Sequence, residues 1–237
     1  ALSIFAKPND GYNYTIQISN NKDNQELINK IRILAKDLDK LMKEETNELP
    51  RVYFDKHLFL PILLKNAKIE KMHPEGLVES EKVFISGLKN YLMNKKDKFT
   101  NKEIYLLRNY PKSGVGFFNL NSFYPDFIMW VKYQKKQIIC FLDPKGLEHE
   151  KRLESEKVKL HKKIKEIEKQ LNNNDIILES FVLSITTYND LTEGLVNPPP
   201  KEEYENNHIL FLSSGWFVWQ EQLFGILEKS IIANNSQ

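Results

Sequence analysis

Two strand-like runs between residues 123 and 147, FYPDFIMWVKYQKKQIICFLDPKGL, each carry an aspartate at one end. Asp126 follows a proline early in the first run, Asp143 ends the second run, and Lys145 stands two positions further on. Carboxylates are hard oxygen ligands of the kind that Mg²⁺ prefers, and a lysine can stabilise the negative charge that develops on a phosphate under attack. The three side chains therefore have the types needed for metal-assisted hydrolysis of a phosphodiester.

The spacing of these residues predicts that they meet in space. The polar tip YQKKQ, residues 133–137, separates the two runs and favours a hairpin centred near Gln134. Asp126 lies about eight residues before that tip and Asp143 about nine after it, so the two carboxylates are expected to be near neighbours across the strand pair. Because residues two apart on a strand point the same way, Asp143 and Lys145 are expected on one side.

Pro144, between Asp143 and Lys145, has two expected consequences. Its carbonyl oxygen is available as a further ligand, and its missing N–H ends or kinks the strand there. The same residues also fit ordinary loop chemistry, with Asp126 capping a turn after its proline and residues 143–146 forming a strand-to-helix turn. The sequence alone leaves both interpretations open.

A fourth acid lies on a predicted helix over residues 77–93. Phe84 and Leu88 share its apolar face, and Glu81 lies seven residues before Leu88, so Glu81 projects from nearly the same side. A carboxylate on a core-facing side is costly unless it is paired or near a cation, which makes Glu81 a candidate site residue. A helix-end acid favoured by the helix dipole, or a solvated rim position, would explain it equally.

The elements that must position these side chains follow from hydrophobic periodicity. Residues 51–64 are expected to form a short strand or helix and then a buried turn, and residues 189–207 an exposed and mobile loop. Strands are predicted over residues 12–18, 103–108, 176–186 and 208–213, and helices over residues 24–45, 148–171 and 216–231. This order predicts an α/β fold with one mixed central sheet flanked by helices. Residues 1–72 are expected to form an N-terminal extension and residues 73–237 the domain that carries the candidate site.

Composition narrows the class of protein. The chain has 237 residues, 41% of them hydrophobic, enough for one sizeable core or one core plus an appendage. Its net charge of +2 neither requires nor excludes nucleic acid. The single cysteine, Cys140, excludes an internal disulfide and a zinc site of paired thiolates. With no apolar run of the roughly 20 residues a membrane span needs, and no signal peptide, a soluble cytoplasmic protein is expected.

These residues resemble a known family. The helix with Glu81, then PDF at 125–127 and DPKG at 143–146, resembles the PD-(D/E)xK nuclease superfamily, which has the restriction-endonuclease-like fold. Over residues 51–147, the stretches HLFLPILL, GLVESEKVF, YLLRN, GVGFFNLNSFYPDFIMW and FLDPKGL resemble the nuclease domain at the C-terminal end of type III restriction enzyme subunits. The same domain occurs on related DEAD/DEAH-type helicases of phage-defence systems.

The resemblance implies a site and a reaction. Asp126, Asp143 and the Pro144 carbonyl would hold Mg²⁺, or Mn²⁺ in its place, with Asp143 where many members have glutamate. Lys145 would orient the attacking water and steady the phosphate, and Glu81 would complete or tune the site. The implied activity is endonucleolytic cleavage of DNA by direct attack of water, leaving 5′-phosphate and 3′-hydroxyl ends.

The resemblance also implies partners: double-stranded DNA, a helicase or translocase domain or subunit, and a modification or specificity subunit. The chain has no GxxxxGK[ST] loop and no DEAD or DEAH box. It is therefore either an excised nuclease domain or works with a separate motor. Two other hypotheses stay open: a catalytically silent DNA-binding or assembly domain of the same fold, and a helical interaction module built on the apolar seams at residues 27–41 and 153–171.

Contact with DNA would begin at its phosphates. The candidate residues are basic side chains expected near the site: Arg108, Lys112, Lys132, Lys135 and Lys136. Each is equally explained as a solvated surface charge. The basic stretch from Lys157 to Lys169 alternates with glutamates and is interpreted as a solvated helix face.

Overall fold

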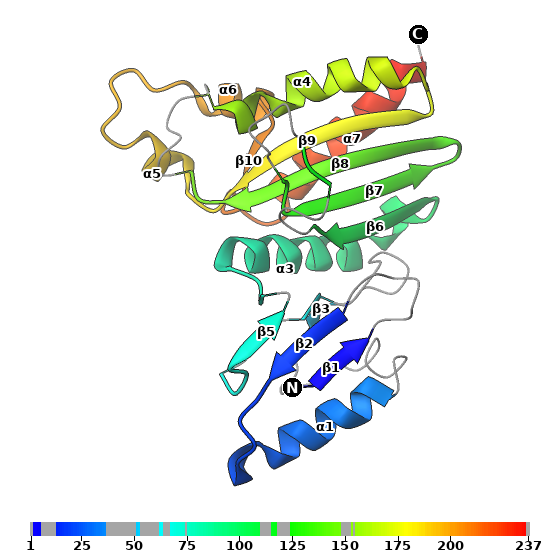
Figure 1. Cartoon of the computed structure of the whole chain (residues 1–237). Coiled ribbons are helices and arrows are strands. Elements are labelled where there is room, and N and C mark those ends of the chain that lie inside the picture. The colour runs from blue at the N-terminus through cyan, green and yellow to red at the C-terminus, as the bar shows by residue number, and fades with distance from the viewer. Residues whose placement is uncertain are drawn as a thin grey trace. The chain divides into compact units, whose positions relative to one another are not determined.

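The computed structural model describes residues 2–5, 13–36, 51–52, 62–63, 67–73, 75–109, 115–117, 124–147, 153 and 155–235. The chain divides into two compact units (Figure 1). The smaller contains Ala1–Asp55 with Leu60–Val78, and the larger contains Lys56–Phe59 with Glu79–Gln237. The division at Val78 lies a few residues after the boundary predicted between residues 72 and 73.

The smaller unit is built on a three-stranded antiparallel sheet. Its strand order is β1-β2-β5, with bounds Leu2–Phe5, Asn13–Gln17 and Lys71–His73. A 3-10 turn, η1 (Lys22–Asn24), leads into helix α1 (Gln25–Lys36), whose Leu27, Ile28 and Ile31 are buried. Two short strands, β3 (Arg51–Val52) and β4 (Ile62–Leu63), pair antiparallel. The predicted continuation of the first helix to residue 45 lies outside the described residues.

The larger unit has a five-stranded mixed sheet with the order β10-β9-β8-β7-β6. Strands β6 (Lys102–Arg108), β7 (Phe127–Tyr133) and β8 (Lys136–Lys145) are antiparallel neighbours, whereas β9 (Ile176–Ser184) and β10 (Ile209–Phe211) continue the sheet in parallel. The unit also contains α3 (Glu79–Asn94), η2 (Lys96–Phe99), α4 (Glu156–Leu171), α5 (Tyr188–Thr192), α6 (Lys201–Asn206) and α7 (Val218–Asn235). The predicted α/β class, with a mixed sheet flanked by helices, is confirmed.

Helices cover both faces of this sheet because its strands are apolar on both sides. On one face, Leu160 and Ile164 of α4 pack against Ile128, Phe141 and Leu178. On the other face, Phe84 of α3 packs on Phe127 with ring centroids 5.2 Å apart, and on Trp219 of α7 at 5.9 Å. Figure 1 shows α3 and α4 on opposite sides of the sheet.

The central hairpin forms as the sequence predicts. Strands β7 and β8 pair from Phe127↔Leu142 to Tyr133↔Lys136, so Gln134 and Lys135 make the turn. Gln134 adopts a positive φ of 54°, which the tight turn requires. The tip of the hairpin and the ends that carry the two aspartates are therefore at opposite ends of the same strands.

Residues 189–207 correct one expectation. They were expected to be an exposed loop, but they contain most of α5 and all of α6, and Leu191 and Tyr204 are 0% exposed. Both side chains pack in a cluster with Leu147, Ile209 and Phe211. The helix predicted from residue 148 is described only from Glu156, after the N-cap Ser155, whose side chain accepts the N–H of Val158. Residues 148–152 and 154 lie outside the described residues.

Candidate active site

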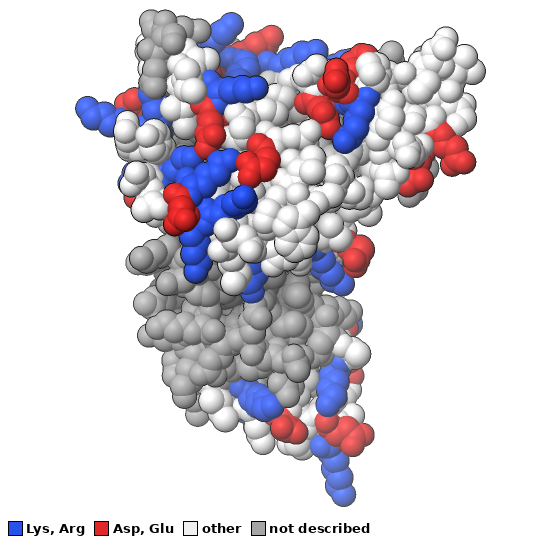
Figure 2. All heavy atoms as spheres, turned by 180° about the vertical axis from the view of Figure 1, so that it is seen from behind, with Lys and Arg blue, Asp and Glu red and all other residues white. Residues whose placement is uncertain are grey.

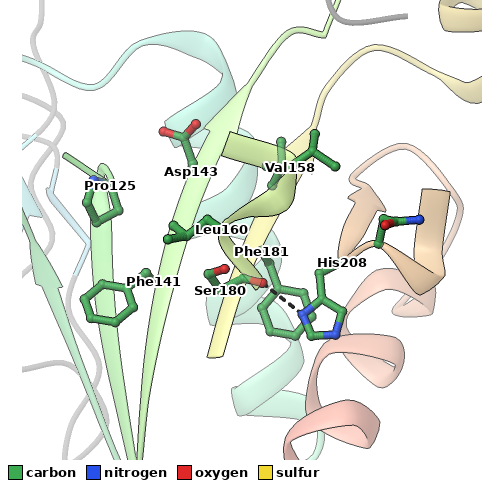
Figure 3. Close-up of a pocket in the computed structure, with 10 residues that line it drawn as sticks. Pro125, Phe141, Asp143, Val158, Leu160, Ser180, Phe181 and His208 are labelled. Atoms are coloured by element: carbon green, nitrogen blue, oxygen red, sulfur yellow. Dashed lines mark hydrogen bonds between the residues drawn. The ribbon is translucent and has the colours of Figure 1, made fainter. Parts of the chain in front are cut away.

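The candidate site lies where the ladder between β7 and β8 stops. That ladder ends at Phe127↔Leu142, whereas β8 continues beside β9 as far as Lys145↔Ser184. Continuing the first register would place Asp126 opposite Asp143 and Pro125 opposite Pro144. Proline has no N–H to donate, so a facing pair of prolines ends a ladder. Figure 3 shows Pro125 and Asp143 at the same end of neighbouring strands.

Asp143 and Lys145 lie on the same side of β8, as predicted. The Lys145 Nζ is 3.8 Å from Asp143 Oδ2, and the two side chains are 18% and 8% exposed. Asp126 is held through its backbone, since its carbonyl accepts the N–H of Asn109 at 2.8 Å. The end of β8 thus presents a carboxylate and an ammonium group together.

The Pro144 carbonyl points to α3. It accepts a buried hydrogen bond from the Ser80 hydroxyl, with the two oxygens 2.9 Å apart. A carbonyl oxygen has two lone pairs, so this bond is compatible with the predicted role of Pro144 as a metal ligand. It also brings the first turn of α3 against the segment that carries Asp143 and Lys145.

Glu81 faces inward, as its helical position indicates, and Arg108 of β6 explains why. Glu81 is 5% exposed, and the Arg108 Nη2 lies 3.4 and 3.3 Å from its two carboxylate oxygens. The side chain of Arg108 is itself only 13% exposed. A buried carboxylate is tolerated here because a guanidinium group pairs with it.

Three of the lysines predicted to contact DNA lie far from this site. Lys132, Lys135 and Lys136 are at or beside the hairpin tip, and Lys136 is ~23 Å of strand from Asp143. Lys132 lies 3.3 Å from Glu103, and Lys136 donates to the Asn174 carbonyl at 2.6 Å. Lys112 lies outside the described residues. A role of all four lysines in DNA binding stays a prediction, and for Lys132, Lys135 and Lys136 it concerns a surface remote from Asp143.

Charged side chains of both signs lie on one face of the larger unit. On the face drawn in Figure 2, basic side chains lie next to acidic ones. Two close ion pairs of this unit, Lys98–Glu221 at 2.7 Å and Lys102–Glu228 at 2.6 Å, follow the same pattern.

The residues fit a hard divalent cation in chemical type. Within the described ranges, no three or more His, Cys, Asp or Glu side chains are grouped so that they could hold a metal ion. Glu81, Asp126 and Asp143 therefore do not form a three-carboxylate cluster. The ligands predicted from the sequence, two carboxylates and the Pro144 carbonyl, are all hard oxygen donors of the kind that bind Mg²⁺.

A narrow cavity lies beside Asp143 (Figure 3). Its volume is about 10 Å³, the space of a single water molecule, and Pro125, Ser180 and His208 are among the residues that line it. A substrate of Asp143 would have to lie outside this cavity, because ligand pockets are far larger.

A buried polar cluster near the edge of β9 was not predicted. Glu179, 1% exposed, accepts from Lys165 Nζ and from Ser230 Oγ, each at 2.7 Å, and lies 3.7 Å from His208 Nδ1. The ring of His161 is 4.7 Å from that of His208. The interpretation of residues 157–169 as a solvated face is thus wrong at Lys165. This cluster is difficult to predict from the sequence, because its residues come from four separate segments of the chain.

The chain matches no protein-family model, no curated protein and no solved structure. No helix among the residues described above is long and apolar enough to cross a membrane. What defines the protein's class is therefore its own architecture: the larger unit is mixed α/β, with a five-stranded sheet flanked by helices, and the smaller unit has a three-stranded sheet.

Proposed function

We propose that the larger unit is a Mg²⁺-dependent endodeoxyribonuclease of the restriction-endonuclease-like fold. The observation that carries the proposal is the placement of Asp143 and Lys145, 3.8 Å apart at the end of β8, beside the start of the strand that follows Asp126. The mixed sheet flanked by helices supports the fold part of the proposal. The sequence resemblance supports a role as the cleavage module of a bacterial restriction or phage-defence helicase-nuclease.

Each residue has a distinct part in the proposed reaction. Asp126, Asp143 and the Pro144 carbonyl would hold Mg²⁺, and Mn²⁺ could replace it. When bound, the ion polarises the scissile phosphate and acidifies the attacking water. Lys145 orients that water and offsets the negative charge that develops on the phosphate. Because Lys145 lies beside Asp143, its ammonium group is at the end of β8 where the metal would bind.

Nicking of supercoiled plasmid in Mg²⁺ or Mn²⁺ tests this proposal. The native chain is compared with Asp126→Asn, Asp143→Asn and Lys145→Gln. Asp175→Asn and Lys201→Ala are matched controls, because both residues lie outside the site and have exposed side chains, 60% and 39%. Cleavage that the three site substitutions abolish, and the two controls retain, would support the nuclease. Equal cleavage by all variants would contradict the assigned site.

A native chain that does not cut is informative when combined with a Mn²⁺ titration by calorimetry. Binding by the native chain that Asp126→Asn and Asp143→Asn both lose would indicate a nuclease that awaits its motor and specificity partners on double-stranded DNA. The absence of binding would reject the proposal in favour of the second candidate, a catalytically silent DNA-binding or assembly domain. The Arg108–Glu81 pair is the observation that favours this candidate, because it engages the acid expected to complete the site.

A further inference from the structure

Two buried side chains satisfy the backbone where the β7–β8 ladder stops. Pro125 and Pro144, which lie just beyond the last pair of that ladder, have no N–H to donate. Buried carbonyls need a donor, because a carbonyl that is buried without one loses its hydrogen bonds to water and gains none in return. Ser80 Oγ donates to the Pro144 carbonyl at 2.9 Å, and Asn109 Nδ2 donates to the Pro125 carbonyl at 2.8 Å.

Asn109 joins three segments of chain. Its backbone N–H donates to the Asp126 carbonyl at 2.8 Å, next to the bond from its side chain to Pro125. The same side chain donates to the Val115 carbonyl at 2.7 Å and accepts the Val115 N–H at 3.0 Å. With only 6% of its surface exposed, Asn109 has little freedom to move. It therefore fixes the backbone of Pro125 and Asp126 against the end of β6.

Ser80 does the same for the other strand. It is 7% exposed on the first turn of α3 and bonds to the residue between Asp143 and Lys145. Its chain neighbour Glu81 is paired with Arg108, the chain neighbour of Asn109. Two adjacent residues of α3, together with Arg108 at the end of β6 and Asn109 directly after it, thus link α3, β6, β8 and the segment that leads into β7.

We infer that Ser80 and Asn109 are positioning residues of the candidate site, Asn109 for Asp126 and Ser80 for Asp143 with Lys145. The inference rests on the proposed function. A ladder normally fixes the distance between facing residues, and where it stops the strand ends are free to open. Ligands for a metal must be held within about 0.5 Å, so the bonds that replace the ladder determine whether the two carboxylates can act together.

The test measures Mn²⁺ affinity of the whole chain by calorimetry, independently of cleavage. Ser80→Ala and Asn109→Ala are each expected to weaken binding about 10- to 100-fold, the usual loss when a residue supporting the ligands is removed. Ser80→Thr keeps the hydroxyl and is expected to restore most of the affinity. A general loss of packing would not be corrected by a hydroxyl alone.

Two controls separate positioning from general stability. Ser230→Ala removes a serine that bonds to Glu179, and Asn24→Ala removes an asparagine, 8% exposed, that donates to the Ser19 carbonyl at 3.0 Å. Both are expected to keep native Mn²⁺ affinity. Native affinity in folded Ser80→Ala and Asn109→Ala would overturn the inference and leave the proposed function intact. If the native chain binds no Mn²⁺, the proposed function fails and this inference with it. If Asn109→Ala does not fold, the Ser80 pair of variants decides.

Discussion

Two ion pairs of strand β6 have the same length and different surroundings. Arg108–Glu81 and Lys132–Glu103 each measure 3.3 Å. The side chains of the first pair are 13% and 7% exposed, and those of the second are 54% and 52% exposed. Water and salt screen the exposed pair, whereas removing one partner of the buried pair leaves a charge without compensation.

Arg108→Ala is therefore expected to lower the free energy of unfolding by about 3–5 kcal/mol, and Lys132→Ala by less than about 1 kcal/mol. Urea unfolding followed by tryptophan fluorescence measures both, because Trp130, Trp216 and Trp219 all belong to the larger unit. Similar small losses in the two variants would mean that Glu81 finds another partner when Arg108 is absent.

At the scale of elements, the hairpin was predictable because its signals are local. Two strand-like apolar runs and a polar tip are enough to give the pairing and its centre near Gln134, and these place Asp143 beside Lys145. The inward position of Glu81 also followed from the helical period. Its partner Arg108 did not, because only the fold brings α3 against β6.

Other elements could not be predicted from the sequence, for physical reasons. Helices α5 and α6 have 5 and 6 residues, too few turns to produce a recognisable period, and each is anchored by one buried side chain. Ser80 and Asn109 are short polar residues whose partners are backbone carbonyls, and no residue type in the sequence marks such a carbonyl. Helix α4 was predicted from an apolar stripe that includes Ile167 and Leu171. The structure leaves these two side chains 36% and 47% exposed.

A polar stripe of α4 faces the open edge of β9. Lys165 reaches Glu179, and Glu168 accepts the N–H of Leu178 at 2.5 Å. His208 Nδ1, 3.0 Å from the Ser180 carbonyl, occupies the next position along that edge and must be the donor. Side chains thus satisfy a strand edge that β10 is too short to cover, which protects it from pairing with another chain.

This cluster makes stability depend on pH. Burial lowers the pKa of His208 and of His161 below 6.5; Glu179 opposes the shift at His208, while the neighbouring Lys165 adds to it. Each folded imidazole binds its proton less tightly than the unfolded one. The folded state is therefore favoured at neutral pH, and this contribution is lost as pH falls below about 6.5 and through the lowered folded pKa values.

His208→Asn is expected to reduce the loss of unfolding free energy between pH 7 and pH 5. Asparagine tolerates the left-handed backbone of this position, where φ is 59°, and it does not titrate. Urea unfolding by tryptophan fluorescence at several pH values gives the slope. An unchanged slope in His208→Asn would show that the pH dependence arises from other groups.

At the scale of the molecule, each unit has its own sheet and its own buried residues. The tryptophans report on the larger unit alone, and the two apolar clusters described above for this unit are formed by residues after Val78. Such a unit has the contacts it needs to unfold as one cooperative body.

A fragment of residues 76–237 is accordingly expected to unfold in urea with the midpoint of the whole chain, within experimental error. Tryptophan fluorescence of both proteins under the same conditions provides the comparison. A midpoint shifted to lower urea, or a broad transition without cooperativity, would mean that the larger unit depends on residues of the smaller one or on residues 56–59.

The two arms of the hairpin, residues 126–133 and residues 136–143, have the same length. The pair of the ladder next to the turn is Tyr133↔Lys136. Asp126 lies seven positions before Tyr133, and Asp143 lies seven positions after Lys136. A single inserted or deleted residue in one arm would misalign the aspartates and turn every later side chain of that arm to the opposite face. The arms can therefore lengthen or shorten only together, and in steps of two residues, if the aspartates are to keep both their alignment and their face. In any related chain that retains both aspartates, the two arms should therefore differ in length from these by the same even number of residues.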